Sequence, residues 1–173
     1  VRFGLGGIKN VGLGPIESII EARRADGPFA DLYDFCARVD RKALNKRMIE
    51  SLIMGGAMDS FGIHRARLVA GIDQAIELAQ AERREREAGQ FNLFGGGEAA
   101  APLEKAPLPE APPWTALEQL AREKSVLGFW FTGNPLDAYR EELDAFTVPF
   151  ANLFTYADRA MVTVGGVITH ISR

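Results

Sequence analysis

Two glycine-rich turns, each followed by a helical pattern, carry the residues best suited to bind an anion. Gly12 and Gly14 form the first turn, and Gly55 and Gly56 form the second. A glycine turn that leads into a helix exposes backbone N–H groups to a phosphate oxygen, and glycine permits close approach. Such contacts bind a nucleic-acid backbone without reading its bases. A helix cap explains the same glycines, and on the glycines alone it is the favoured interpretation.

Basic residues near the second turn favour a phosphate ligand. His64, Arg65 and Arg67 lie at a predicted helix start, and Lys46 and Arg47 precede them. Positive charge at a helix N-terminus is unfavourable by about 0.3–1 kcal/mol per residue, and a bound phosphate reverses that sign. Residues 1–70 hold 11 basic and 8 acidic residues, whereas residues 71–173 hold 9 and 15. We therefore predict that the first part of the chain binds nucleic-acid backbone.

A short apolar peptide, residues 90–94, follows the longest helical pattern between two glycines. Large apolar side chains in such a position are costly in water unless they dock. Docking on their own domain is the simpler interpretation, and anchoring in the pocket of a partner is the alternative. Burial of Leu93 and Phe94 would contribute roughly 1.5–3 kcal/mol each, which alone gives micromolar binding at best.

No catalytic or metal-binding constellation is evident. His64 and His170 are far apart in the sequence and have no cysteine or carboxylate cluster at ligand spacing. There is no Asp-x-Asp pair, no P-loop, and no third glycine to complete a dinucleotide fingerprint after Gly12 and Gly14. The single cysteine, Cys36, lies in an apolar pattern and indicates a buried thiol. No apolar run reaches the roughly 18 residues needed to span a bilayer.

The elements that must position these residues are mostly helical. Helices are predicted from about Pro15 to Asp26, Ala30 to Val39, Leu44 to Met54 and His64 to Ala88. In the first of these, Gly14 suits the N-cap position, Pro15 the first helical position and Glu17 the first turn. Thr115 and Glu118 form a capping box that starts another helix. A further helix begins near Asn134 and Asp137.

The remaining segments indicate a linker and a β segment. Residues 95–113 contain three Gly, five Ala and five Pro, so we expect a disordered linker that packs no core. Residues 129–131 are a short strand-like run, and residues 162–173 are β-branched and partly alternating, as in strands. A strand without partners forms no stable sheet, so we expect the chain to be a piece of a longer protein.

Three motifs resemble the bacterial replicative DNA polymerase III alpha subunits, members of the C-family of polymerases. They run from Phe3 to Gly12, from Leu44 through Arg47 to Gly55–Asp59, and from Leu127 to Leu136. The resemblance implies that residues 1–89 form a tandem helix-hairpin-helix domain on duplex DNA. The residues it assigns to DNA contact are Lys9, Gly12, Gly14, Lys46, Arg47, Gly55, Gly56, His64, Arg65 and Arg67.

The same resemblance implies a sliding-clamp peptide of the form Gln-x-x-Leu-Phe. Gln90 would fill a polar sub-site, Leu93 and Phe94 a hydrophobic pocket, and Phe91 a position that the pattern tolerates. Residues 95–113 would be the linker, residues 114–145 a helical connecting segment, and residues 146–173 the start of a truncated oligonucleotide-binding barrel.

For the parent protein the resemblance implies a DNA-directed DNA polymerase that uses Mg²⁺ outside this segment. The implied partners are duplex DNA, the clamp (the beta subunit) and other replisome subunits, in the cytoplasm and at no membrane. No catalytic residue and no cofactor is assigned to this segment. Two alternatives stay open: the error-prone homologue of the alpha subunit, and a non-catalytic helical scaffold that binds proteins.

Overall fold

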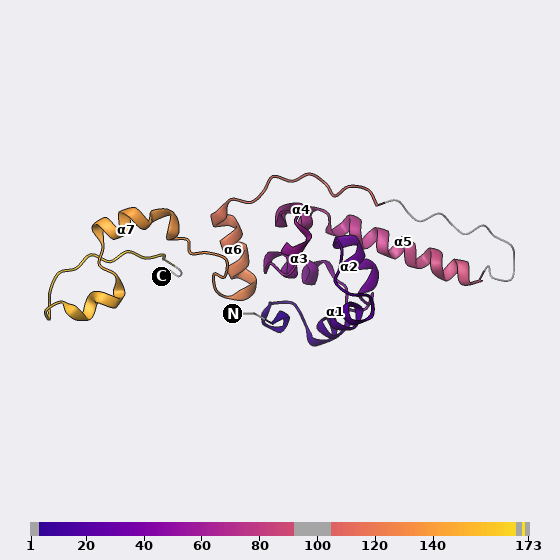
Figure 1. Ribbon diagram of the computed structural model, residues 1–173, viewed down its shortest axis with the longest axis horizontal. Helices are drawn as coiled ribbons and strands as arrows, with labels where there is room; N and C mark the ends of the chain where they lie inside the picture. The colour runs from indigo at the N-terminus through magenta and orange to yellow at the C-terminus, as the bar shows by residue number, and fades with distance from the viewer. Residues whose placement is uncertain (1–3, 92–104, 169–170, 172–173) are drawn as a thin grey trace.

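The computed structural model describes residues 4–91, 105–168 and 171, and these are mostly helical, as predicted (Figure 1). The α-helices are α1 (Leu13–Asp26), α2 (Leu32–Arg38), α3 (Lys46–Met54), α4 (Arg65–Ala70), α5 (Ile72–Phe91), α6 (Ala116–Leu127) and α7 (Arg140–Phe146). The 3-10 helices are η1 (Leu5–Gly7), η2 (Asp59–Phe61), η4 (Asp137–Tyr139) and η5 (Phe150–Thr155). Helices α1 to α4 gather with the first turns of α5, and α6 lies beside them.

Helix α1 begins two residues before the predicted position. Its N-cap is Gly12 rather than Gly14, and the helix ends at Asp26 before Gly27, which has a φ of 79°. Because the helix starts at Leu13, Glu17 falls outside the first turn, and that turn holds no acidic residue. No carboxylate of this first turn therefore neutralises the positive end of the helix dipole.

Polar side chains set the starts of the neighbouring helices. The Asp31 side chain accepts a hydrogen bond from the backbone N–H of Asp34 at the start of α2, and Asn45 accepts one from Met48 at the start of α3. Thr115 and Glu118 form the predicted capping box of α6, in which each side chain satisfies the other's backbone N–H. The predicted capping box is thus confirmed.

The long helix predicted from His64 to Ala88 is wrong in one respect, because it is two helices. Helix α4 ends at Ala70, Gly71 caps it, and α5 begins at Ile72. A side chain at Gly71 would collide with the Leu108 side chain, which is seated against this position. Glycine at position 71 therefore leaves the space that the Leu108 side chain occupies.

Residues 105–113, which we name the strap, correct the expectation of a linker that packs against nothing. Leu108 is only 8% exposed and belongs to the hydrophobic core. The Tyr33 hydroxyl donates to the carbonyl of Ala106 at 2.7 Å, and Lys105 pairs with Asp31 at 3.0 Å. The strap passes α4 on its way to α6 (Figure 1). The strap contains few large apolar residues, but the Leu108 side chain and the backbone carbonyls of residues 106–108 are enough to dock it on the helices.

One core joins α6 to the first five helices. Each of these helices contributes buried residues to this core, as do the segment before α1, the strap and α6. They include Ile8, Val11, Ile19, Leu32, Phe35, Met48, Ile49, Leu52, Ile53, Leu68, Ile72, Leu108, Val126 and Leu127. Helix α6 packs against α3. The expected boundary at residue 89 therefore does not separate two packed units, because α6 returns to the same core.

The expected strands are absent from the described residues after α6. Gly128, with a φ of 88°, ends α6, and residues 129–131 form a bend and irregular chain rather than a strand. Between residues 146 and 168 there is the 3-10 helix η5, then a turn at residues 158–159 and chain without regular secondary structure. The backbone N–H of Val148 donates to the Thr163 carbonyl at 2.8 Å. β-branched residues favour strands, but a sheet needs partner strands.

Candidate nucleic-acid interface

The turn that leads into α1 is anchored from both sides. Ile8 and Val11 are buried, 5% and 8% exposed, so they fix its two ends in the core. Between them Asn10 adopts a left-handed conformation, with a φ of 66°, and its side-chain amide donates to Ser51 Oγ at 3.0 Å. The backbone N–H of Lys9 donates to the carbonyl of Val126 at 2.9 Å. We name residues 8–14 the α1 hairpin; these contacts attach it to the core, while residues 12–14 are exposed to solvent.

The N-terminus of α1 is uncapped. No side chain caps it, whereas α2, α3, α4 and α6 are capped by Asp31, Asn45, His64 and Thr115. Among the residues that the structure describes, the backbone N–H groups of Gly12, Leu13 and Gly14 find no acceptor. Pro15 has no N–H. These exposed donors at the positive end of a 14-residue helix are the arrangement that binds an anionic oxygen.

Neither steric contact nor backbone strain requires glycine at the two glycine positions of the α1 hairpin. Gly12 has a φ of −80° and a ψ of 169°, which any residue adopts, and a side chain there would make only ordinary contact with Pro15. At Gly14 an added Cβ would meet nothing within 4 Å. Glycine in a helix costs up to about 1 kcal/mol relative to alanine. An unneeded glycine at an open surface favours a ligand that approaches the backbone closely.

The second glycine turn differs, because the fold itself requires its glycines. Gly56 has a φ of 80°, and a side chain at Gly55 would lie 3.2 Å from both the Ile8 side chain and the Ser51 carbonyl. The N–H groups of Gly55 and Gly56 bond to the carbonyls of Ser51 and Ile53, both at 3.0 Å. This turn ends α3 and offers no free donors. The interpretation as a helix cap therefore holds for it.

Arg65 is buried and does not face a ligand, which corrects its assignment as a DNA contact. It is 5% exposed. Its guanidinium donates to both carboxylate oxygens of Asp59 at 2.8 and 2.7 Å, to the Met54 carbonyl at 2.9 Å and to Glu123 Oε1 at 3.4 Å. Hydrogen bonding to Asp59 raises the pKa of the Arg65 guanidinium, so it stays charged. The positive charge of Arg65, which the sequence assigned to a phosphate ligand, is instead neutralised by the carboxylates of Asp59 and Glu123.

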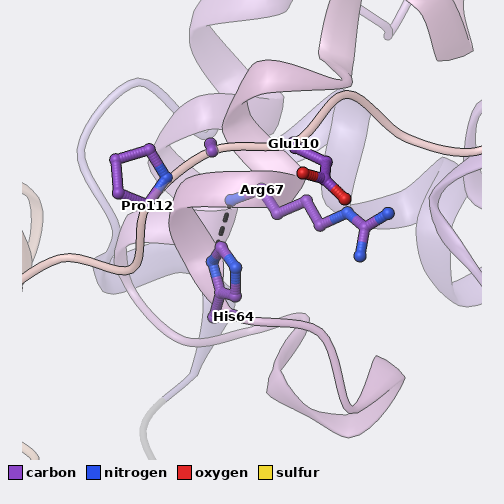
Figure 2. Close-up of a pocket in the computed structure, with 5 residues that line it drawn as sticks. His64, Arg67, Glu110 and Pro112 are labelled. Atoms are coloured by element: carbon purple, nitrogen blue, oxygen red, sulfur yellow. Dashed lines mark hydrogen bonds between the residues drawn. The ribbon is translucent and has the colours of Figure 1, made fainter.

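His64 and Arg67 face the strap, where they line an open pocket of about 380 Å³ with Glu110, Ala111 and Pro112 (Figure 2). His64 Nδ1 accepts a hydrogen bond from the backbone N–H of Arg67 at 3.2 Å, so it caps α4. The Arg67 guanidinium donates to the carbonyl of Leu108 at 3.3 and 3.1 Å. Both residues therefore already serve the fold.

The remaining predicted basic residues are exposed but not gathered into one patch. Lys46 pairs with Asp73 at 2.6 Å, a surface ion pair that contributes little to stability. Lys46 and Arg47 begin α3, whereas Ile8, the neighbour of Lys9, lies beside Gly55 at the other end of this nine-residue helix, which is about 13 Å long. Lys9 is the predicted basic residue that belongs to the α1 hairpin.

The predicted clamp peptide lies mostly outside the described residues. Gln90 and Phe91 are the last two residues of α5, and Asn92, Leu93 and Phe94 fall outside the described ranges.

In the part of the chain that the structure describes, no three His, Cys, Asp or Glu side chains converge as a metal site would require. Within the same ranges, no helix has both the length and the apolar character to cross a bilayer. Burial raises the pKa of the Cys36 thiol to about 12.

Comparison with known proteins first gives the class of motif. Residues 1–68 match the family model described as a helix-hairpin-helix motif, and this range contains the α1 hairpin and the second glycine turn. The first part of the chain thus carries a helix-hairpin-helix motif, whereas the tandem domain over residues 1–89 that the resemblance implied stays a prediction.

The relatives then show which longer proteins the chain resembles. The chain is 40% identical over 170 residues to the DNA polymerase III subunit alpha of Vibrio cholerae, covering 97% of this chain and 15% of that protein. The alpha subunits of Xylella fastidiosa and Escherichia coli K12 are 38% and 40% identical, covering 83% and 84% of this chain and 12% and 13% of theirs. The chain is therefore homologous to one segment of DNA polymerase III alpha subunits, and it spans only about 15% of the length of the Vibrio relative.

Proposed function

We propose that this chain holds duplex DNA by its sugar-phosphate backbone through the α1 hairpin. The observation that carries this proposal is the pair of glycines, Gly12 and Gly14, which no internal contact or backbone strain requires. Three N–H groups without acceptors among the described residues, an uncapped helix end and the exposed Lys9 supply the donors and positive potential. Amides at a helix end contact phosphate and not base edges, so binding is independent of sequence.

The polymerase relatives supply the context of this binding. We propose that the chain is the part of a replicative alpha subunit that keeps the DNA seated while synthesis proceeds elsewhere. The chemistry, with its Mg²⁺ ions, belongs to other parts of such a subunit, in the cytoplasm. Residues 146–173 would begin its oligonucleotide-binding barrel, whose strands would form with partners beyond this segment.

A second contact, with the sliding clamp, is proposed for residues 90–94. Its support is the Gln-x-x-Leu-Phe pattern and the position of that pattern at the end of α5, a 20-residue helix that extends beyond the other helices (Figure 1). Two weak contacts on one polymerase raise each other's effective concentration to about millimolar. DNA and clamp held together would thus stabilise a complex that neither contact maintains alone.

The salt dependence of duplex binding tests the proposed DNA contact. We expect the anisotropy of a labelled duplex to report binding at low salt. The slope of log K against log salt should be about −1 to −3, as for one to three neutralised phosphates. Duplexes of unrelated sequence should bind equally well. An absence of binding at low salt would instead favour a helical scaffold that binds proteins and whose glycine turns are only caps.

A further inference from the structure

Helix α6 lies well beyond the helix-hairpin-helix match, yet it is bonded to the α1 hairpin. The match ends at residue 68, whereas α6 begins at Ala116. We propose that α6 is an integral part of the DNA-holding unit, and that Glu123 is a positioning residue for the α1 hairpin although it touches no DNA. This inference rests on the proposed DNA contact and concerns what keeps that contact in its binding geometry.

Glu123 is the anchor of α6. It is 0% exposed, and its Oε1 lies 3.4 Å from Nη1 of the buried Arg65 on α4. Its Oε2 accepts hydrogen bonds from the backbone N–H of Phe131 at 2.8 Å and of Thr132 at 2.9 Å, and from the Thr132 hydroxyl at 3.3 Å. A carboxylate without solvent is tolerated only with such a set of partners. The pair therefore fixes how α6 sits on α4.

One turn further along α6, Val126 connects the helix to the α1 hairpin. Glu123 and Val126 are three residues apart, so they lie on the same face of the helix. Val126 is 5% exposed in the core that also contains Ile8, and its carbonyl accepts the hydrogen bond from Lys9 N at 2.9 Å. The contacts run from α4 through Arg65, Glu123 and Val126 to Lys9, three residues before Gly12.

Loss of the Glu123 carboxylate should therefore release the hairpin without removing any DNA-contacting group. If the binding-competent arrangement falls to between a third and a tenth of the population, the apparent affinity falls by the same factor. Simple electrostatics predicts the opposite sign, because Glu123→Gln removes a negative charge and favours binding to an anion. The direction of the change thus separates positioning from charge.

The test is duplex affinity of the full chain with Glu123→Gln, compared with Glu142→Gln as a charge-matched control. Glu142 is exposed on α7. We expect Glu123→Gln to weaken binding about three- to tenfold and Glu142→Gln to leave it equal or slightly tighter. Equal or tighter binding by both variants overturns the inference, whereas failure of the unchanged chain to bind duplex overturns the proposed DNA contact instead.

Amide hydrogen exchange at Lys9 supplies a readout that general destabilisation would not give. In Glu123→Gln the Lys9 amide should lose protection selectively, while amides in α2 and α5 keep theirs. Uniform loss of protection would mean that Glu123 only stabilises the fold, and it would overturn the positioning role. Should Glu123→Gln not fold, Val126→Ala leaves the ion pair intact and loosens the same link; it should also weaken duplex binding, and unchanged affinity overturns the inference.

Discussion

Replacement of Gly14 by aspartate is expected to raise the thermal stability of the protein while it nearly abolishes duplex binding. Gly14 is the second residue of α1, in open space. A carboxylate at this end of a helix is favourable by about 0.3–1 kcal/mol, and the loss of glycine adds up to about 1 kcal/mol. The same carboxylate would occupy the N–H groups and repel a phosphate, so we expect affinity to fall at least about tenfold. Thermal melting and duplex titration measure the two effects.

Gly14→Ala separates steric from electrostatic effects at the same position. It should also raise the melting temperature, and it should weaken duplex binding less than aspartate does, because it only hinders close approach. Ala116→Asp places the same charge at the exposed start of α6 and serves as the control. If Gly14→Asp binds duplex as tightly as the control variant does, the α1 hairpin is not the site.

Replacement of Leu93 and Phe94 by alanine together is expected to abolish binding to a bacterial sliding clamp. Each buried side chain contributes roughly 1.5–3 kcal/mol, so the double change should weaken binding by about 10² to 10⁴. Calorimetric titration with the purified clamp measures this loss. The duplex affinity should not change, because the proposed DNA contact lies in the α1 hairpin, and circular dichroism should show the same helical content.

Phe154→Ala is a suitable control for the clamp experiment. Phe154 is 95% exposed, so its replacement removes a comparable apolar side chain without disturbing packing. This variant should bind the clamp as the unchanged chain does. Equal clamp affinity for the control and the Leu93/Phe94 double variant would remove the peptide assignment.

Local signals in the sequence predicted the helices well. The helical apolar periodicity, the Asp26–Gly27–Pro28 stop and the Thr115–Glu118 capping box depend on neighbours within a few residues, and each appears in the structure. The start of α1 was misplaced, because Pro15 is acceptable at either the first or a later position of the first turn. Such boundaries depend on small energy differences.

Features that depend on distant residues could not be predicted in the same way. The basic cluster after the second turn indicated a phosphate, but the partners of Arg65 are Asp59 and a glutamate 58 positions later. Likewise Leu108 packs into the hydrophobic core, although it belongs to a proline-rich segment whose composition predicts no packing. One signal was available: Glu123 lies among Leu120, Val126 and Leu127 on the apolar stripe of α6. A charged residue on such a stripe predicts a buried partner.

Backbone amide resonances of the α1 hairpin give the most direct test of DNA holding by this chain. A titration with a short blunt duplex at low salt should shift the amide signals of Gly12, Leu13 and Gly14 first and most, with saturation at the affinity found by anisotropy. Added salt should reverse these shifts. Shifts confined to the second glycine turn and α4, with the three hairpin amides unmoved by saturating duplex, would contradict the assignment of the α1 hairpin as the DNA-holding site.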